Sequence, residues 1–280
     1  MPELPEVETV RRQLAPIVEG ARLQGVRVLD ARWSRPWAPR RMEEALEGRR
    51  VLSLGRRGKY LVWELDEGTF LVQHLRMTGA VLYEPEAEPG HVRVRMSLRR
   101  GRARAGRLVI VDPRRFGTGE VLHGEGALEE FFAARLGLEP LQEGFTAEHL
   151  RGLARGRRAP IKALLLDQRR VAGVGNIYAD EALYRARIHP RRAAGSLTLA
   201  QYAGLRDAVI EVLEAGIEAR GASVEDFRHV DGFRGSFQDE FRVHRRAGKP
   251  CGRCGGPITK LVVAGRGTYV CETCQRLRRG

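Results

Sequence analysis

The period of the apolar residues changes near residue 135, from strand-like to helical, and this change limits the possible folds more than any other feature. Between residues 23 and 123, short runs rich in Val and Leu alternate with Gly, Pro and charged turns, which is typical of antiparallel strands. The runs lie at 26–33, 50–55, 59–65, 69–77, 91–98, 107–112 and 120–123. Strands of this kind predict a β-sandwich or a barrel.

Helical periodicity occurs at the start of the chain and again in its second half. The first stretch begins at Pro5 and carries Val7, Val10, Leu14 and Val18 on one stripe. Four later stretches have a helical pattern, at 146–156, 160–170, 176–186 and 198–221, and residues 223–250 predict a long loop. The chain therefore combines a strand-rich first part with a helical second part.

The charge favours a polyanionic partner. Lys and Arg number 49 against 35 Asp and Glu, which gives a net charge of +14. This balance indicates nucleic acid, and the alternative is a basic surface that is merely solvated. Only four of the cations are lysines, among them Lys59 and Lys162. Where arginine is the default cation, a lysine can mark a place that needs a compact ammonium or an amine able to lose its proton.

The first twenty residues have no apolar segment typical of a secretory signal, so we expect a cytoplasmic protein. No run approaches the ~18 apolar residues of a membrane span. All four cysteines lie in two CxxC pairs, Cys251 with Cys254 and Cys271 with Cys274, sixteen residues apart. This spacing predicts a four-thiolate zinc site.

Two glycine-flanked residues are candidates for binding phosphate. Arg266 stands between two glycines and is expected at the tip of a hairpin inside the zinc segment, where it could contact a phosphate or a base. Asn176 follows a Gly-Val-Gly turn at the start of a predicted helix, where it could cap the helix and contact a phosphate. The alternatives are a solvated turn arginine and an ordinary helix cap.

The extreme N-terminus has the residues of a nucleophilic site. Initiator methionine is commonly removed ahead of proline, and Pro2 would then carry a free secondary amine. Such an amine titrates near about pH 8, so it is partly unprotonated and nucleophilic at neutral pH. It would condense with an aldehyde carbon, which in DNA is C1′ of a deoxyribose losing its base. Glu3 is the neighbouring carboxyl, and the alternative is a terminus that only caps a helix.

Six motifs together resemble the formamidopyrimidine-DNA glycosylases, the bacterial base-excision enzymes for oxidised purines. They are MPELPEVETVRR, GRRGKY, HLRMTG, DPRRFG, GVGNIYADE and the paired CxxC motifs. The resemblance implies an α+β multidomain fold, with DNA between its two main parts. These are an N-terminal β-sandwich domain with flanking helices at 1–135, a linker at 136–150, a helical helix-two-turn-helix domain at 151–242 and a zinc finger at 243–280.

The resemblance also implies a reaction. Pro2 would attack C1′, expel the damaged base and form a Schiff base, with Glu3 as the acid and base partner. Successive β- and δ-elimination would then cut the strand on both sides of the lost nucleoside. Lys59 matches the lysine that transfers a proton during β-elimination, and Arg266 matches the residue assigned to the later elimination. One structural zinc ion would be held by Cys251, Cys254, Cys271 and Cys274.

The remaining matches concern DNA contacts. Together with Lys59 and Arg266, His74 and Asn176 match the family's phosphate-binding set, while Met77, Arg114 and Phe116 match the residues that fill the gap left by a flipped nucleotide. Arg157 stands where the family has a DNA-contacting lysine. Lys162 matches a lysine near the damaged-base pocket, with a helix-surface position as an equal alternative. His91 is the remaining histidine of a His-x-His pair whose first member is replaced by Pro89.

The sequence thus predicts a monomeric DNA glycosylase and abasic-site lyase acting on double-stranded DNA that contains 8-oxoguanine or a formamidopyrimidine. Two alternatives remain. One keeps the chemistry but takes oxidised pyrimidines or hydantoins, as endonuclease VIII does. The other is a non-catalytic zinc-ribbon protein that binds DNA through its basic surface. The segment 221–242 is expected to close over the flipped base.

Overall fold

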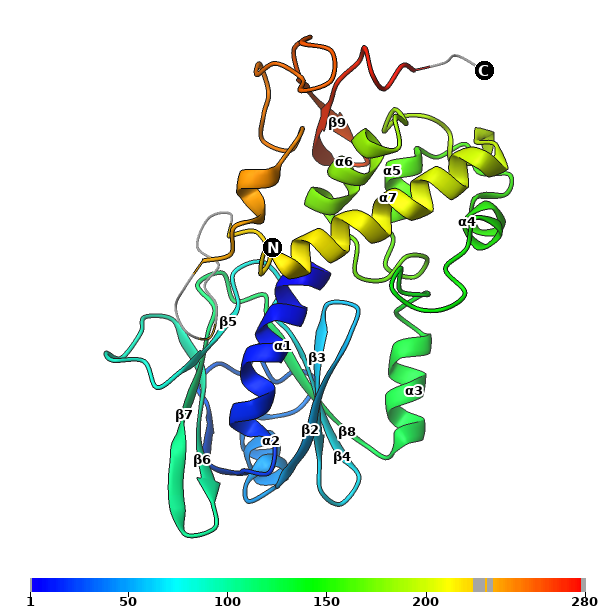
Figure 1. Cartoon of the computed structure of the whole chain (residues 1–280). Helices are drawn as coiled ribbons and strands as arrows, with labels where there is room; N and C mark the ends of the chain where they lie inside the picture. Colours follow the sequence, from blue (N-terminus) through cyan, green and yellow to red (C-terminus); the bar gives the residue numbers. More distant parts are fainter. Residues whose placement is uncertain (1, 224–229, 231–233, 278–280) are drawn as a thin grey trace. The chain divides into compact units, whose positions relative to one another are not determined.

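The computed structural model describes residues 2–223, 230 and 234–277, and Figure 1 traces the chain. The chain divides into two compact units. The first contains Met1–Ala133 and Ala219–Ser236, and the second contains Ala134–Glu218 and Phe237–Gly280. A short segment that follows the longest helix therefore belongs with the N-terminal unit.

The first unit is built on two four-stranded antiparallel sheets, with strand orders β1-β6-β7-β5 and β2-β3-β4-β8. One core contains buried side chains from both sheets, so the predicted β-sandwich is confirmed. The strands are β1 (Arg22–Val28), β2 (Val51–Arg57), β3 (Tyr60–Leu65), β4 (Thr69–His74), β5 (Ala80–Tyr83), β6 (Val92–Arg100), β7 (Ala103–Val111) and β8 (Thr118–His123).

Helix α1 (Leu4–Val18) supplies an apolar stripe to this core. Val7, Val10, Leu14 and Val18 are all fully buried, as the period predicts. Each such side chain stabilises the fold by roughly 1.5–3 kcal/mol when it leaves water. The helix begins one residue before Pro5, with Glu3 as its N-cap.

Three elements of the first unit have no clear signal in the sequence. Helix α2 (Pro39–Leu46) buries only Met42 and Leu46, helix α3 (Glu125–Ala133) buries only Phe131, and β5 is four residues long. Each of these elements buries only one or two side chains, which is too few to reveal a period. The strand predicted at 26–33 ends at Val28, after which the chain turns and places Trp33 in the core.

The second unit contains the four predicted helices, each somewhat shorter than its periodic stretch. They are α4 (Ala147–Ala154), α5 (Ile161–Leu166), α6 (Asn176–Arg185) and α7 (Leu199–Glu218), with short 3₁₀ turns at Ala194–Ser196 and Phe237–Glu240. Strands β9 (Thr259–Val263) and β10 (Arg266–Val270) form the predicted hairpin. Thr146 caps α4 by accepting a hydrogen bond from the His149 N–H at 3.1 Å.

Helix α6 is the central element of the second unit. It packs against α5, α7 and strand β10, and every residue from Ile177 to Tyr184 is buried. Two of these buried residues, Asp180 and Glu181, are acidic. A helix buried on all sides needs partners for such groups, and these partners form the cluster described below.

Part of the predicted loop at 223–250, and of the segment 221–242 expected to cover a flipped base, lies outside the described residues. Its described remainder contains the 3₁₀ turn at Phe237–Glu240. Within the described part of the chain, no helix combines the length and the apolar character needed to cross a bilayer.

The packing of Gly119 against Trp33 gives a test of the sandwich core. A Cβ at position 119 would lie 2.2 Å from the indole ring, which is 2 % exposed. We expect Gly119→Ala to lower the free energy of unfolding by about 1–3 kcal/mol, because the ring must move within a packed core. Urea unfolding measures the change.

Gly126→Ala is the matched control, because no atom lies within 4 Å of a Cβ at that position of α3. Alanine should there stabilise the helix by roughly 0.5–1 kcal/mol. Equal effects of the two substitutions would contradict the packing argument.

Candidate functional site

The N-terminus is held in place by a buried carboxylate. Pro2 and Glu3 are both buried immediately before α1. The backbone N–H of Glu3 donates to Glu6 Oε2 at 2.8 Å, and the other oxygen of Glu6 accepts from the Ala222 N–H at 2.7 Å. Glu6 itself is 1 % exposed. One side chain therefore fixes both the start of the chain and the segment that returns to it within the first unit.

Lys59 and His74 lie close together at one end of the second sheet. Lys59 is in the tight turn between β2 and β3, and its neighbour Tyr60 pairs with His74 across the sheet. Lys59 is 4 % exposed and His74 is 7 % exposed. Because Lys59 is close, its charge acts on the imidazole. The structure thus brings together two residues that are fifteen positions apart in the sequence.

The imidazole of His74 is neutral and has a defined tautomer. Burial lowers the pKa of His74 to about 3, and the positive charges of Arg76 and Lys59 act in the same direction. Its Nδ1 accepts a hydrogen bond from the Arg76 N–H at 2.9 Å, so the proton of the neutral ring is on Nε2. His74 can therefore donate one hydrogen bond to an anion without carrying a charge.

Asp112 brings two turns of the first unit together. Its carboxylate accepts from the Thr78 hydroxyl, from the Arg114 N–H at 3.3 Å and from the Gly117 N–H at 2.6 Å. Met77 lies half-buried in the first turn, and Phe116 lies 50 % exposed in the second. The three residues matched to gap filling, Met77, Arg114 and Phe116, thus project from turns that share one buried anchor.

The two arginines of the DPRRFG motif differ in their contacts. Arg115 binds Asp30 with two nitrogen atoms, at 2.6 and 2.9 Å. Arg114 is exposed and lies over the ring of Phe116, with 5.1 Å between its Cζ and the ring centroid. Arg115 therefore stabilises the turn, while Arg114 and Phe116 present a cation and an aromatic ring to solvent.

His91 and Arg157 are exposed residues at the ends of elements. His91 precedes β6 with a φ of 61°, and its carbonyl accepts from the Asp112 N–H at 3.1 Å. Arg157 follows α4 and donates from Nε to the Leu153 carbonyl at 2.7 Å. Both side chains are accessible to a ligand.

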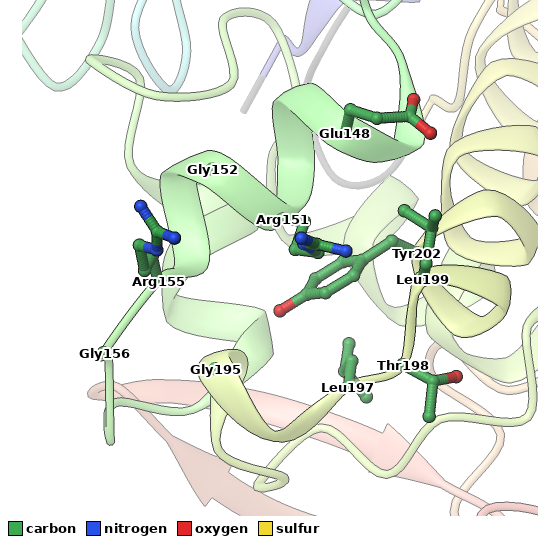
Figure 2. Close-up of a pocket in the computed structure, with 10 residues that line it drawn as sticks. All are labelled: Glu148, Arg151, Gly152, Arg155, Gly156, Gly195, Leu197, Thr198, Leu199 and Tyr202. Carbon is green, nitrogen blue, oxygen red and sulfur yellow. The ribbon is translucent and has the colours of Figure 1, made fainter.

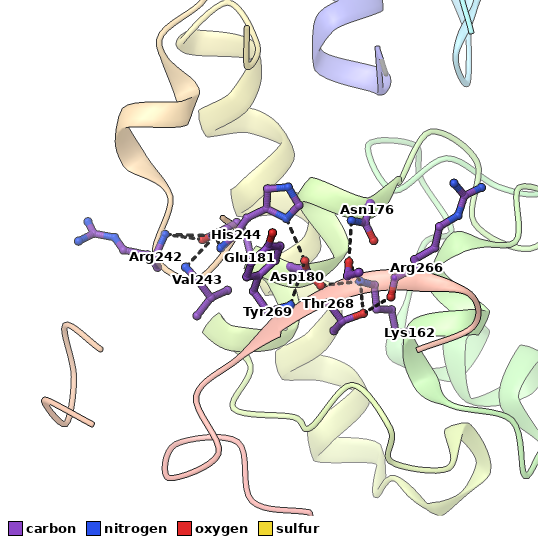
Figure 3. Close-up of polar contacts among 11 residues, drawn as sticks. Lys162, Asn176, Asp180, Glu181, Arg242, Val243, His244, Arg266, Thr268 and Tyr269 are labelled. Atoms are coloured by element: carbon purple, nitrogen blue, oxygen red, sulfur yellow. Dashed lines mark hydrogen bonds and ion pairs between the residues drawn. The ribbon is translucent and has the colours of Figure 1, made fainter. Parts of the chain in front are cut away.

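Lys162 differs from its sequence-based expectation. It is completely buried in α5, so the alternative of a helix-surface lysine is wrong. Its Nζ donates to Asp180 Oδ1 at 2.6 Å and to Thr268 Oγ1 at 2.8 Å (Figure 3). The Lys162 ammonium is therefore bound by acceptors inside the second unit.

Asn176 and Arg266 also lie differently from their predicted positions. Gly175 is the N-cap of α6 and Asn176 is the first helical residue, so Asn176 does not cap the helix. Its Nδ2 donates to the Gly267 carbonyl at 2.9 Å. The hairpin turns at Ala264 and Gly265, both with positive φ, and Arg266 begins β10 opposite Val263. Arg266 is thus beside the tip, and its side chain is exposed.

A buried polar cluster lies beside strand β10, which carries Arg266 (Figure 3). Asp180 Oδ2 contacts His244 Nδ1 at 2.9 Å and accepts from the Tyr269 N–H at 3.4 Å. The carboxylate of Glu181 accepts from three consecutive backbone N–H groups, at Arg242, Val243 and His244. Burial raises the pKa of Glu181, and these N–H groups oppose the shift. The cluster therefore fixes the segment 242–244 and strand β10.

The four cysteines form a site that fits a zinc ion. Their sulfur atoms all lie within 4.8 Å of one another. The Cys251 and Cys274 sulfurs are 3.9 Å apart, and those of Cys254 and Cys271 are 3.4 Å apart. Tetrahedral zinc with Zn–S bonds of about 2.3 Å places its ligands roughly 3.8 Å from one another. A four-thiolate set is also the composition of structural zinc sites, so the residues fit this metal.

The zinc segment is joined to the end of α6. The Tyr184 hydroxyl lies 3.2 Å from Cys251 Sγ, and although burial opposes ionisation, this contact helps to lower the pKa of Cys251 to about 6. Arg253 donates to the Tyr184 carbonyl at 2.6 Å and stacks over its ring at 4.3 Å from the centroid. This arginine thus ties the first CxxC pair to the last turn of α6.

A separate pocket of about 660 Å³ lies between α4, the turn at Ala194–Ser196 and the start of α7 (Figure 2). Arg151, Arg155 and Glu148 contribute its charged groups, and the Tyr202 hydroxyl donates to the Ala194 carbonyl at 2.5 Å. None of the site residues expected from the sequence lines it.

Four residues important to these arrangements were missed in the sequence: Glu6, Asp112, Asp180 and Glu181. Each is a carboxylate within or directly after an apolar stretch. An acidic residue is rarely buried unless it has hydrogen-bond partners. An acid inside an apolar stretch of sequence is therefore a signal that could have identified each of these residues.

The depressed pKa of His74 predicts a pH-dependent stability. The unfolded chain takes up a proton near about pH 6.5, whereas the folded chain does so only near pH 3. The contribution of His74 to the free energy of unfolding is therefore fully present above about pH 6.5. It is lost progressively as the pH falls from there towards pH 3. Between pH 7 and 5 this group should remove up to about 2 kcal/mol of unfolding free energy.

Urea unfolding at several pH values measures this loss, and His74→Gln should remove that part of the pH dependence. An unchanged slope in the variant would show that the imidazole is already accessible to protons in the folded state.

The sulfur geometry predicts the effect of losing one ligand. Cys254→Ser should lower the zinc content from about one ion per chain and destabilise the segment around the hairpin, because a structural site needs all four ligands. Metal analysis of the purified protein measures the content. Thr273→Ser, an exposed change inside the second CxxC pair, should keep the metal, and equal zinc content in the two variants would contradict the assignment.

Comparison with known proteins identifies the family. Three family models match the chain: the formamidopyrimidine-DNA glycosylase N-terminal domain over residues 1–119, its H2TH domain over 136–228, and the zinc finger found in FPG and IleRS over 248–277. The formamidopyrimidine-DNA glycosylase of Pelotomaculum thermopropionicum is 44 % identical, and the match covers 99 % of this chain and 100 % of the relative.

Solved structures agree with these matches. A Lactococcus lactis FPG mutant in complex with DNA containing Fapy-dG has a TM-score of 0.91 at 35 % identity, covering 99 % of this chain and 100 % of that one. The wild-type L. lactis protein in complex with DNA containing an oxidised pyrimidine has a TM-score of 0.89 at 35 % identity, with the same coverage. The thiolate cluster, the sandwich and the helical unit are thus features of one known family, and the chain belongs to the formamidopyrimidine-DNA glycosylases.

Proposed function

We propose that this DNA glycosylase of base excision repair acts on duplex DNA containing oxidised purines, and that Pro2 is its nucleophile. The family and the relatives bound to damaged DNA support the substrate class. The single observation that supports the nucleophile is the fixed terminus: Pro2 is buried directly before α1, and Glu6 holds the following N–H at 2.8 Å. A nucleophile must be held in place for its attack to be efficient.

The reaction begins at the sugar. After removal of Met1, the lone pair of the Pro2 nitrogen attacks C1′, and the bond from C1′ to the damaged base breaks with its electron pair leaving on the base. The proton that the Pro2 nitrogen then loses neutralises the departing base. Glu3 protonates the ring oxygen as the sugar opens, which leaves an iminium ion between Pro2 and C1′. The positive end of α1 disfavours the protonated amine and so increases its nucleophilic fraction.

Two eliminations then cut the strand. Loss of the C2′ proton with departure of the 3′ phosphate is β-elimination, and loss of the 5′ phosphate in δ-elimination follows. Lys59 serves the first step as proton carrier, and Arg266 serves the second. Lys59 is suited to the role because it lies in a tight turn, 4 % exposed, where its ammonium has little freedom.

The remaining residues bind DNA. His74 and Asn176 each offer an N–H donor to a phosphate, together with Lys59 and Arg266. Met77, Arg114 and Phe116 fill the gap in the stack after the damaged nucleotide has turned out, because an apolar wedge, a guanidinium and a ring can replace a missing base. The exposed His91 and Arg157 add contacts to the backbone.

These roles agree with the proposed division into a catalytic domain at 1–135, a linker at 136–150, a helical DNA-binding domain at 151–242 and a zinc finger at 243–280. When bound, zinc supplies no chemistry to the reaction and fixes the four thiolates, and with them the hairpin that carries Arg266. We place the enzyme in the cytoplasm as a monomer acting on the bacterial nucleoid.

Borohydride trapping tests the nucleophile. Incubation with a duplex containing 8-oxoguanine and borohydride should give a stable protein–DNA adduct, because reduction fixes the iminium ion. Peptide mapping should locate the adduct at Pro2. Retaining Met1 through an N-terminal tag should reduce trapping by more than about a hundredfold, because no free amine is then present.

Binding provides the control. The tagged protein should keep its affinity for DNA, with the fall at rising salt that phosphate contacts produce. A protein that binds lesion DNA but never forms the adduct in its untagged form would be the non-catalytic zinc-ribbon protein. An adduct formed at full rate with Met1 attached would contradict the role of Pro2.

Lesion preference distinguishes the nearer alternative. The L. lactis relative has been solved with an oxidised pyrimidine as well as with Fapy-dG, so both classes are candidates. Single-turnover rates on matched duplexes with 8-oxoguanine, a formamidopyrimidine, an oxidised pyrimidine or a hydantoin should favour the two purine lesions. Faster excision of the oxidised pyrimidine would assign the chain to the endonuclease VIII type of substrate.

A further inference from the structure

Arg266 projects from a part of the chain that has little support of its own. It is the first residue of β10 in a two-stranded hairpin, and the turn before it contains Ala264 and Gly265. Two-stranded hairpins are only marginally stable without packing on another element. An arginine that binds one particular phosphate therefore needs its backbone to be fixed by contacts with the rest of the second unit.

The hydroxyl of Thr268 provides a direct link to this backbone. Thr268 is fully buried, and its Oγ1 donates to the Arg266 carbonyl at 3.0 Å. The same oxygen accepts from Lys162 Nζ at 2.8 Å. An ammonium has no acceptor, so the lysine must donate, and the hydroxyl proton is left for the Arg266 carbonyl. The direction of both hydrogen bonds is thus determined.

Lys162 extends this support to the neighbouring residue. Besides Thr268, its ammonium donates to Asp180 Oδ1 at 2.6 Å and reaches the Gly267 carbonyl at 3.5 Å. Asn176 Nδ2 donates to the same carbonyl at 2.9 Å. The Gly267 carbonyl is therefore held by side chains from α5 and α6, next to the Arg266 carbonyl that Thr268 holds.

Asp180 completes the connection. Its Oδ2 accepts from the Tyr269 N–H at 3.4 Å and contacts His244 Nδ1 at 2.9 Å. Both Asp180 and Lys162 are 0 % exposed. A buried ion pair is poor evidence for stability, because apolar side chains of similar size often stabilise equally well. What apolar side chains could not do is direct hydrogen bonds at the Arg266 carbonyl and at the Tyr269 N–H.

We propose that Thr268 is a positioning residue for Arg266, and that the buried Lys162–Asp180 pair acts through its hydroxyl to fix the backbone from which the guanidinium reaches DNA. The proposal rests on the proposed function, in which Arg266 binds phosphate and serves the second elimination. Thr268 itself touches no substrate, since its side chain is completely buried.

Hydrogen exchange in the absence of DNA tests the first half of the proposal. Thr268→Val keeps the shape of the side chain and removes the hydroxyl, so backbone amides at 266–270 should exchange at least about tenfold faster. Thr268→Ser keeps the hydroxyl and should restore protection. Thr69→Val is the matched control, because Thr69 is equally buried in β4 of the other unit. Where Thr268→Val does not give folded protein, Thr268→Ala replaces it.

A double-mutant cycle with Arg266→Ala tests the consequence for DNA. With Arg266 present, Thr268→Val should weaken binding of a duplex containing a stable abasic-site analogue by about tenfold and slow the second elimination by a similar factor. In the Arg266→Ala background the same change should have almost no further effect, because its target is gone.

Two results would overturn the proposal: unchanged exchange at 266–270 in Thr268→Val, or effects of the two substitutions on DNA binding that simply multiply. Failure of the proposed function looks different, since the parent protein would then give no borohydride adduct or Arg266→Ala would bind the duplex as tightly as the parent.

Discussion

The carboxylate of Glu6 is the constraint on which the first unit's chemistry depends. It accepts the Glu3 N–H with one oxygen and the Ala222 N–H with the other, while remaining 1 % exposed. A chain terminus usually frays because nothing opposes its entropy. Here one buried anion binds two backbone donors more than two hundred residues apart, so the first residues have a defined place.

Other buried carboxylates do the same for other loops. Asp112 gathers the turns that carry Met77 and Phe116, Glu181 accepts three successive N–H groups from 242–244, and Asp180 holds strand β10 beneath Arg266. Arg114, Phe116 and Arg266 are themselves exposed and contribute little to their own fixation. Loops without a core of their own are thus positioned by hydrogen bonds from their backbone N–H groups to buried carboxylates. Hydrogen bonds to a charged acceptor are stronger than neutral ones.

The sequence predicted regular elements well where an apolar period was long enough. The α1 stripe, seven of the strands and the four helices of the second unit were identified because their burial requires a repeating pattern. Helices α2 and α3 and strand β5 were missed, since eight, nine and four residues with only one or two buried side chains give no period. Turn details were also wrong by one or two residues: Gly175 caps α6, and Arg266 begins β10 beside the hairpin tip.

Lys162 shows a different limit. Its sequence context on a short helix was compatible with a surface position or a place beside the base pocket, and the structure buries it completely against Asp180. Nothing local distinguishes these cases, because the partner is eighteen residues away and becomes a neighbour only when α5 packs on α6.

The sequence alone determined the class of fold, the zinc ligands and the identity of the candidate nucleophile, because each depends on residue type and spacing along the chain. Only the tertiary structure decided which carboxylates are buried, which of two adjacent arginines binds Asp30, and what supports the hairpin that carries Arg266. These depend on side chains meeting across long sequence separations in a packed interior, where a charged group must find a partner. A local sequence pattern does not show which residue is the partner of a buried charged group.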